Sequence, residues 1–231
     1  MTDDVVVHLP VAVVYPDTTG WPTPKLPALK HDDEIFGRGI LNIVVRAMVG
    51  QLPAQGDRKG YRGLLNLVRL TDKAINEYMA ACEACAEFEA HKNEGRVSPF
   101  FRAIDHIESC VNSLYRATRH AQRLRSRIET SKLDRTDWRA VQNAEAQLKR
   151  VRDTIEHTEE QLANDVITDE QLGLLWLTEQ SLAIAGHEIS YANLVTWIER
   201  VHKIATALRT AEAPEANASA PAGQDRGTEN G

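Results

Sequence analysis

The sequence has few cysteines, no long apolar run and no excess of positive charge. Three cysteines, an odd number, do not make a disulfide framework. The apolar runs stop short of the roughly 18 residues that a membrane span needs, and the first residues, MTDDVVVHLP, carry acids where a secretory signal would be basic. A formal net charge of −6 argues against a general nucleic-acid binder. A Gly-rich phosphate loop and internal repeats are also absent. We therefore expect a cytoplasmic protein without a membrane segment.

Helical periodicity dominates what is present. The chain of 231 residues is long enough to bury a core. Apolar residues recur at three- and four-residue spacing, which predicts helices over 33–51, 61–91, 99–128, from a cap at Asp134 or Thr136 to near Asn164, and from a cap at Ser190 to Leu208. Helices of about thirty residues joined by short turns become antiparallel neighbours. The sequence thus predicts an all-α fold, an up-and-down helical bundle.

Three segments depart from this helical pattern. Residues 1–32 are expected to form an extended N-terminal arm with a short strand over Val5–Val14, because four prolines between positions 16 and 27 exclude a helix. Within the bundle domain, 33–209, two apolar runs predict a small β-hairpin at about 173–186, before the last helix. Residues 210–231 are rich in Ala, Pro, Glu, Asn and Gly, a composition typical of a disordered tail.

A Cys82-Glu83-Ala84-Cys85 pair falls within the predicted helix 61–91. Two cysteines at this spacing occur in zinc and redox sites. However, a zinc site needs a second pair of ligands at matching spacing, and a thioredoxin-like motif follows a strand. Because the pair lies on the apolar face of the helix, we interpret both residues as packed core thiols.

Positive charge is concentrated in one stretch of this acidic chain. Between Tyr115 and Arg152 there are eleven Arg or Lys residues against four Asp or Glu residues, a net of +7, which leaves the rest at −13. A local excess of this kind is typical of a phosphate-binding groove. Arg-rich helices also form solvated faces with ion pairs at short spacing, as Arg152 and Glu156 would, so both interpretations stand.

The most distinctive short motif is Arg152-Asp153-Thr154-Ile155-Glu156-His157, within the amphipathic stretch Val141–Leu162. An arginine followed by a polar Asp, three more residues and a histidine resembles the signature of the HEPN superfamily. The resemblance implies a small helical bundle and, as in many members, a metal-independent ribonuclease. It also implies a role as a toxin or in defence, and with that role a cognate antitoxin or inhibitor protein as a partner.

The residue types suit that chemistry. Cleavage of RNA by its own 2′-hydroxyl needs proton transfer, which histidine provides near neutral pH, and positive charge on the phosphorane, which arginine provides as a fork. Neither a metal nor a cofactor is required. The resemblance implies that the catalytic residues are Arg152, His157 and Asp153. The candidate RNA-binding residues are Lys149, Arg150, Arg116, Arg119 and Arg123, and those supporting the site are Glu108 and Glu156.

The spacing of the motif favours a dimer. Positions five apart on an unbroken helix point roughly 140° away from each other, so Arg152 and His157 of one chain do not converge easily on one phosphate. In the family the cleft forms between two protomers, and a homodimer would resolve the conflict here. Two alternatives remain open: a non-catalytic HEPN-like module that binds a protein or nucleic-acid partner, and a structural helical scaffold.

Overall fold

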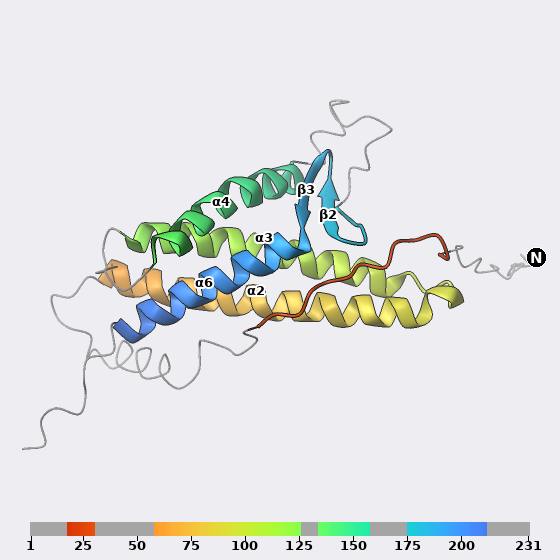
Figure 1. Cartoon of the computed structure of the whole chain (residues 1–231), viewed down its shortest axis with the longest axis horizontal. Coiled ribbons are helices and arrows are strands. Elements are labelled where there is room, and N and C mark those ends of the chain that lie inside the picture. Colours follow the sequence, from red (N-terminus) through yellow and green to blue (C-terminus); the bar gives the residue numbers. More distant parts are fainter. Residues whose placement is uncertain (1–17, 31–57, 126–133, 158–174, 212–231) are drawn as a thin grey trace, which may run out of the picture.

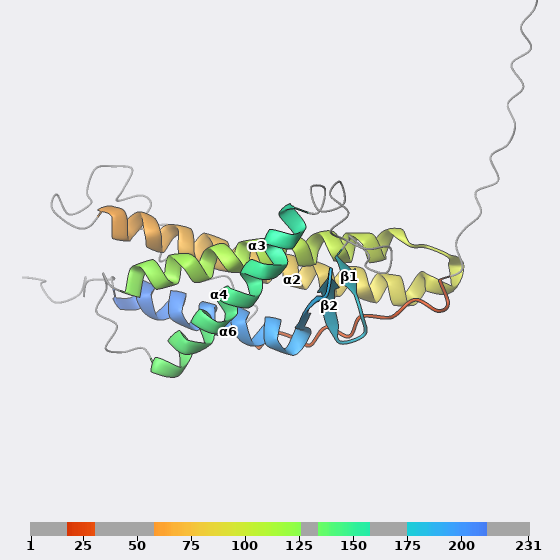
Figure 2. The same cartoon turned by 90° about the horizontal axis from the view of Figure 1, so that it is seen from above.

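The computed structural model describes residues 18–30, 58–125, 134–157 and 175–211, which are mostly helical with one small antiparallel sheet. The elements in chain order are α2 (Arg58–His91), the 3-10 turn η1 (Lys92–Glu94), α3 (Ser98–Arg125), α4 (Arg135–Glu156), β1 (Trp176–Leu177), β2 (Ser181–Ile184), β3 (His187–Ser190) and α6 (Tyr191–Ala211). Successive helices alternate in direction (Figure 1), and α4 crosses α3 obliquely (Figure 2). The predicted helical bundle is therefore present in outline, with more sheet than expected.

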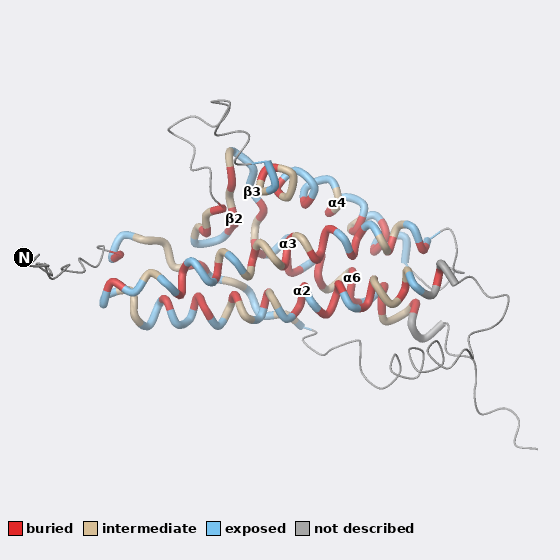
Figure 3. The backbone as a smooth tube through the Cα atoms, turned by 180° about the vertical axis from the view of Figure 1, so that it is seen from behind, coloured by how far each residue is buried: buried red, intermediate tan, exposed pale blue. Residues whose placement is uncertain are grey.

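Helices α2 and α3 lie side by side along most of their length and carry most of the core (Figure 3). Gly63 permits their close approach, since a Cβ there would lie 3.0 Å from Leu124 Cδ2. The predicted stripe of α3 from Ile107 to Leu124 is buried. The three- and four-residue spacing of this stripe would begin at Phe101, but Phe101 is 43% exposed and its neighbour Phe100 is fully buried instead. Helix α2 also begins at Arg58, three residues before the predicted Tyr61.

Helix α4 begins as predicted, because the Asp134 side chain accepts a hydrogen bond from Thr136 N. Its stripe of Val141, Ala144, Leu148 and Val151 is buried. Its end differs from the prediction: the helix stops at Glu156 and His157 is the C-cap residue, so the geometry of an unbroken helix through His157 does not apply.

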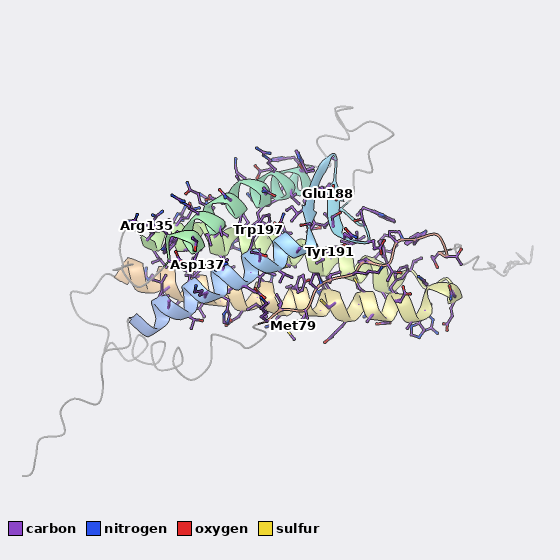
Figure 4. The ribbon with its side chains drawn as sticks, viewed as in Figure 1. Met79, Arg135, Asp137, Glu188, Tyr191 and Trp197 are labelled. Atoms are coloured by element: carbon purple, nitrogen blue, oxygen red, sulfur yellow. The ribbon has the colours of Figure 1, made fainter. Side chains whose placement is uncertain are left out.

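A buried ion pair joins α4 to α6. Its acidic member, Asp137 on α4, is labelled in Figure 4. Asp137 is fully buried, and its carboxylate contacts Arg200 and lies 2.7 Å from Lys203 Nζ. Both cations are partly exposed, so only the carboxylate is removed from water. Ser190 Oγ accepts a hydrogen bond from Asn193 N at 3.2 Å, which is the predicted cap of α6. The predicted apolar face of α6, from Leu194 to Leu208, is buried.

The predicted two-stranded hairpin is in fact a three-stranded antiparallel sheet in the order β1-β2-β3. The turn between β1 and β2 contains Glu179 and Gln180, which are not residues that tight hairpin turns favour. Thr178 stabilises this turn instead, because its Oγ1 accepts a hydrogen bond from Ser181 N at 3.0 Å. The second turn has positive φ at both Ala185 (43°) and Gly186 (79°), the backbone that tight hairpins use. The strand β3 was missed because alanine rarely adopts this conformation and gives no turn signal.

An extended segment, 18–30, crosses the C-terminal half of α2 and reaches the sheet and α6 (Figure 1). Pro27 O accepts a hydrogen bond from the Tyr78 hydroxyl at 2.8 Å, Lys25 N donates to Glu179 O at 2.9 Å, and Lys30 N donates to Glu199 Oε1 at 3.0 Å. Trp21 packs among the rings of Phe88, Phe100, Phe101 and Trp176. The segment therefore connects helices and sheet that are distant in sequence.

Several predictions concern residues outside the described ranges. These are the strand over Val5–Val14, the helix over 33–51, the end of a helix at residue 128, and residues 212–231 of the predicted disordered tail. The tail was predicted to begin at residue 210, but residues 210 and 211 belong to α6, which continues past the predicted end at Leu208 to Ala211.

The cysteines of α2 pack in the core, as predicted. Cys85 is 5% exposed and Cys82 is half-buried, and burial raises the pKa of Cys85 to about 12 and that of Cys82 to about 11. We expect Cys85→Ser to lower the free energy of unfolding by about 1–3 kcal/mol, because a hydroxyl would be buried in an apolar site. Cys82→Ser is the matched control and should cost less. Urea denaturation of both variants measures the difference, and equal losses would contradict the expectation.

Candidate functional site

Helices α3 and α4 enclose a groove of about 520 Å³, within the range of ligand-binding pockets. Its lining is Asn112, Tyr115, Arg116, Arg119, His120 and Arg123 from α3, and Arg152 and Glu156 from α4. We call this the arginine groove, because four of its eight lining residues are arginines. Its lining residues come from α3 and α4, and Figure 2 shows α4 crossing α3.

The sequence of α3 places its basic residues on one face. Arg116, Arg119, His120 and Arg123 are separated by three or four positions or adjoin one another, and residues at this spacing are neighbours on a helix surface. The three arginines are exposed, whereas Ala117, Thr118 and Ala121 between them are buried. The helix therefore directs its apolar residues into the core and its guanidinium groups toward the groove.

Arg152 is held in place by three contacts. Its guanidinium lies 5.2 Å from the ring centroid of Tyr115, forms an ion pair with Glu156, and has Nη1 3.4 Å from Asp153 Oδ1. The side chain is 28% exposed, so it faces the groove without being sealed from water. The aromatic ring beneath the guanidinium and the carboxylate one helical turn away both restrict the rotamers of Arg152.

Tyr115 also supports a second arginine. The Arg119 guanidinium lies 5.8 Å from the same ring centroid, and Arg119 Nε is 3.9 Å from Glu145 Oε1 on α4. Tyr115 is buried, with 4% of the residue exposed, so its ring is a fixed platform beneath both guanidinium groups. Arg119 and Arg152, which are 33 positions apart in sequence, are thereby brought together. Two guanidinium groups that are held close together suit an anion with several oxygen atoms.

The structure groups some of the predicted site residues and separates others. Of the predicted set, Arg116, Arg119, Arg123, Arg152 and Glu156 line the arginine groove. Lys149, Arg150, Asp153, His157 and Glu108 are not among the residues that line it.

The residues outside the lining have identifiable places. Asp153 lies between Arg152 and Lys149, whose Nζ is 3.5 Å from Asp153 Oδ2. His157 is exposed at the end of α4, directly after the groove residue Glu156. Glu108, which was expected to hold Arg152, lies nearer the N-terminus of α3 than the groove residues do. Its pKa is raised, mainly by burial and to a smaller extent by the nearby carboxylate of Asp105. In the described part of the chain, the carboxylates on Arg152 are those of Glu156 and Asp153.

His120 is a groove residue that sequence reasoning missed. His120 follows Arg116 by four positions, one fewer than the spacing of Arg152 and His157, so the motif predicts only an ordinary residue on the flank of a helix. It is half-buried, and its pKa lies below the usual value because of burial and the nearby guanidinium groups of Arg123, Arg116, Arg119 and Arg69. Its spacing of four from Arg116 and three from Arg123 was the signal that could have placed it in the site.

Neither a metal site nor a membrane-spanning helix is found within the described ranges. No group of three or more His, Cys, Asp or Glu residues there is arranged to hold a metal ion. Among the helices of those same ranges, none combines the length and the apolar character that crossing a membrane requires.

Comparisons of the chain with protein-family models, with curated proteins and with solved structures find no match.

Proposed function

We propose that this protein binds RNA, with the phosphodiester backbone held in the arginine groove. The observation that carries the proposal is the convergence of four arginine side chains from two helices on one groove, in a chain of net charge −6. A protein that repels polyanions overall but gathers positive charge at one place favours a local, specific contact with phosphate. RNA as the particular nucleic acid comes from the resemblance of the motif at Arg152 to HEPN proteins.

The geometry of the groove supports phosphate binding in two further ways. The lining holds four arginines and one carboxylate, that of Glu156, while Glu145 and Asp153 contact Arg119 and Arg152 from outside it. The lining itself therefore offers a net positive charge to a ligand. In addition, Arg119 and Arg152 are positioned in advance by the Tyr115 ring. Less side-chain entropy is then lost when a phosphate binds.

The test is a titration of fluorescently labelled oligouridylate of about twelve nucleotides, a length within the usual range of single-stranded sites. Anisotropy should show saturable binding whose logarithmic affinity falls with the logarithm of salt concentration, by roughly 0.7 per phosphate contact. Oligodeoxythymidylate of equal length measures the preference for RNA. Failure of oligouridylate to bind at low salt would overturn the proposal.

RNA cleavage is the second candidate, and the placement of the motif at the end of α4 favours it. Arg152 lines the arginine groove and forms an ion pair with Glu156, and His157 is the exposed residue directly after Glu156. An exposed histidine is accessible to the groove of a second protomer, which is the composite arrangement that the resemblance implies. On this hypothesis, Arg152 stabilises the phosphorane and His157 transfers a proton.

For this candidate we expect His157→Ala and Arg152→Ala each to reduce cleavage of RNA in EDTA by about 10²–10⁴-fold. Arg152→Lys should not restore activity, because a lysine lacks the planar fork. The products should carry 2′,3′-cyclic phosphate and 5′-hydroxyl ends. His187→Ala, which changes an exposed histidine on β3, is the matched control. Intact RNA after incubation with the wild-type protein, together with a monomer by light scattering, would leave RNA binding alone.

A further inference from the structure

The position of His120 has a consequence for how the arginine groove binds its ligand. We propose that His120 binds the phosphodiester as an imidazolium, so that each RNA molecule that enters the groove takes up a proton there. The inference rests on the proposed RNA binding and adds a fifth cationic ligand to the four arginines.

The placement of His120 is the geometric basis. It lies between Arg116 and Arg123 on the groove face of α3, and it is half-buried, so its ring has limited contact with water. The charged groups around it are Arg116, Arg119 and Arg123 on its own helix, Arg69 on α2, and Arg152 and Glu156 on α4. A phosphate that bridges Arg116 and Arg123 therefore also lies beside the imidazole.

In the empty groove, the surroundings favour the neutral ring. Burial and the positive guanidinium groups both penalise a charged imidazole, and they lower the pKa of His120 below its usual value. The arginines keep their charge under all relevant conditions. At a pH above this lowered pKa, the groove without a ligand therefore holds four permanent cations and one neutral histidine.

A bound phosphodiester reverses this preference. Its negative charge offsets the repulsion from the arginines, and its oxygen atoms accept a charge-assisted hydrogen bond from a protonated ring. The pKa of His120 must then be higher in the complex than in the free protein. By linkage, affinity rises as the pH falls through the range between the two pKa values, and it levels off on either side.

The experiment measures the affinity for labelled oligouridylate at about pH 8 and about pH 5.5, the range over which histidine changes charge. The probe itself does not titrate in this range, and the salt concentration is kept constant. We expect the affinity of the wild-type protein to rise about tenfold at the lower pH, the worth of one charge-assisted hydrogen bond.

Three variants separate His120 from the other histidines. His120→Gln should bind with the weaker affinity at both pH values, and His120→Arg, a permanent cation, with the stronger affinity at both. His106→Gln is the matched control, since this half-buried histidine lies on the same helix but its Nδ1 is 2.8 Å from Glu77 Oε2, away from the groove. It should keep the full pH dependence. Calorimetry of the wild-type protein in buffers of different ionisation enthalpy should show proton uptake directly, independent of any variant.

The possible failures are distinguishable. Binding that does not change between the two pH values, or a His120→Gln variant that keeps the wild-type rise, would overturn the role of His120 and leave the proposed RNA binding intact. Absence of oligouridylate binding at both pH values would overturn the proposed function and this inference with it.

Discussion

Replacement of Arg116 and Arg123 together by glutamate should weaken oligouridylate binding by at least about 100-fold. Two charge-assisted hydrogen bonds, each contributing about 1.5–3 kcal/mol, would be lost, and two negative charges would face the phosphates. Both side chains are exposed on α3, so the fold should tolerate the change. The salt dependence should also become shallower, by roughly 0.7 in logarithmic slope for each contact removed. Anisotropy titrations at several salt concentrations measure both effects.

The matched control is Arg135→Glu together with Arg139→Glu. These two arginines are exposed on α4 and belong to the same basic stretch, but they do not line the arginine groove. The double variant changes the net charge of the protein by the same amount. If both double variants lose affinity equally, binding depends on the overall charge of the stretch and the groove has no special role.

Phe100→Ala is the substitution with the largest expected effect on stability, about 3–5 kcal/mol. The ring is fully buried, and its centroid lies 4.9 Å from that of Trp176, 5.1 Å from that of Phe88 and 5.2 Å from that of Trp21. Its removal would open a cavity where α2, α3, β1 and the extended segment meet. Because small domains unfold at a cost of about 5–15 kcal/mol, such a loss is a large fraction of the total.

Phe101→Ala provides the comparison, since the same side chain at the next position is 43% exposed. It should lower the free energy of unfolding by much less, about 1 kcal/mol or below. Guanidinium denaturation of the two variants, followed by tryptophan fluorescence, measures the difference. Trp21 and Trp176 report directly on the cluster. Similar losses for the two variants would contradict the burial of Phe100.

The sequence determined those parts of the fold that depend on local chemistry. The apolar spacing from Ile107 to Leu124 and from Val141 to Val151 gave the buried faces of α3 and α4, because a helix of fixed period converts spacing into a face. Asp134 and Ser190 gave helix starts, since their side chains satisfy backbone N–H groups within three residues. The third strand was missed because the turn at Ala185 depends on pairing between strands, which can hold an alanine at positive φ.

For the site, the sequence alone gave a basic face on α3, with Arg116, Arg119 and Arg123 one turn apart, and a motif around Arg152. Only the tertiary structure decided which of these face one another. The crossing of α4 over α3 brings Arg152 onto the Tyr115 ring and turns Glu156 into the groove, while His157 lies at the helix end outside it. It also places His120, which no spacing motif selected, among the arginines. Helix packing follows from the summed contacts of whole apolar faces, so a short motif cannot specify the residues that lie across from it.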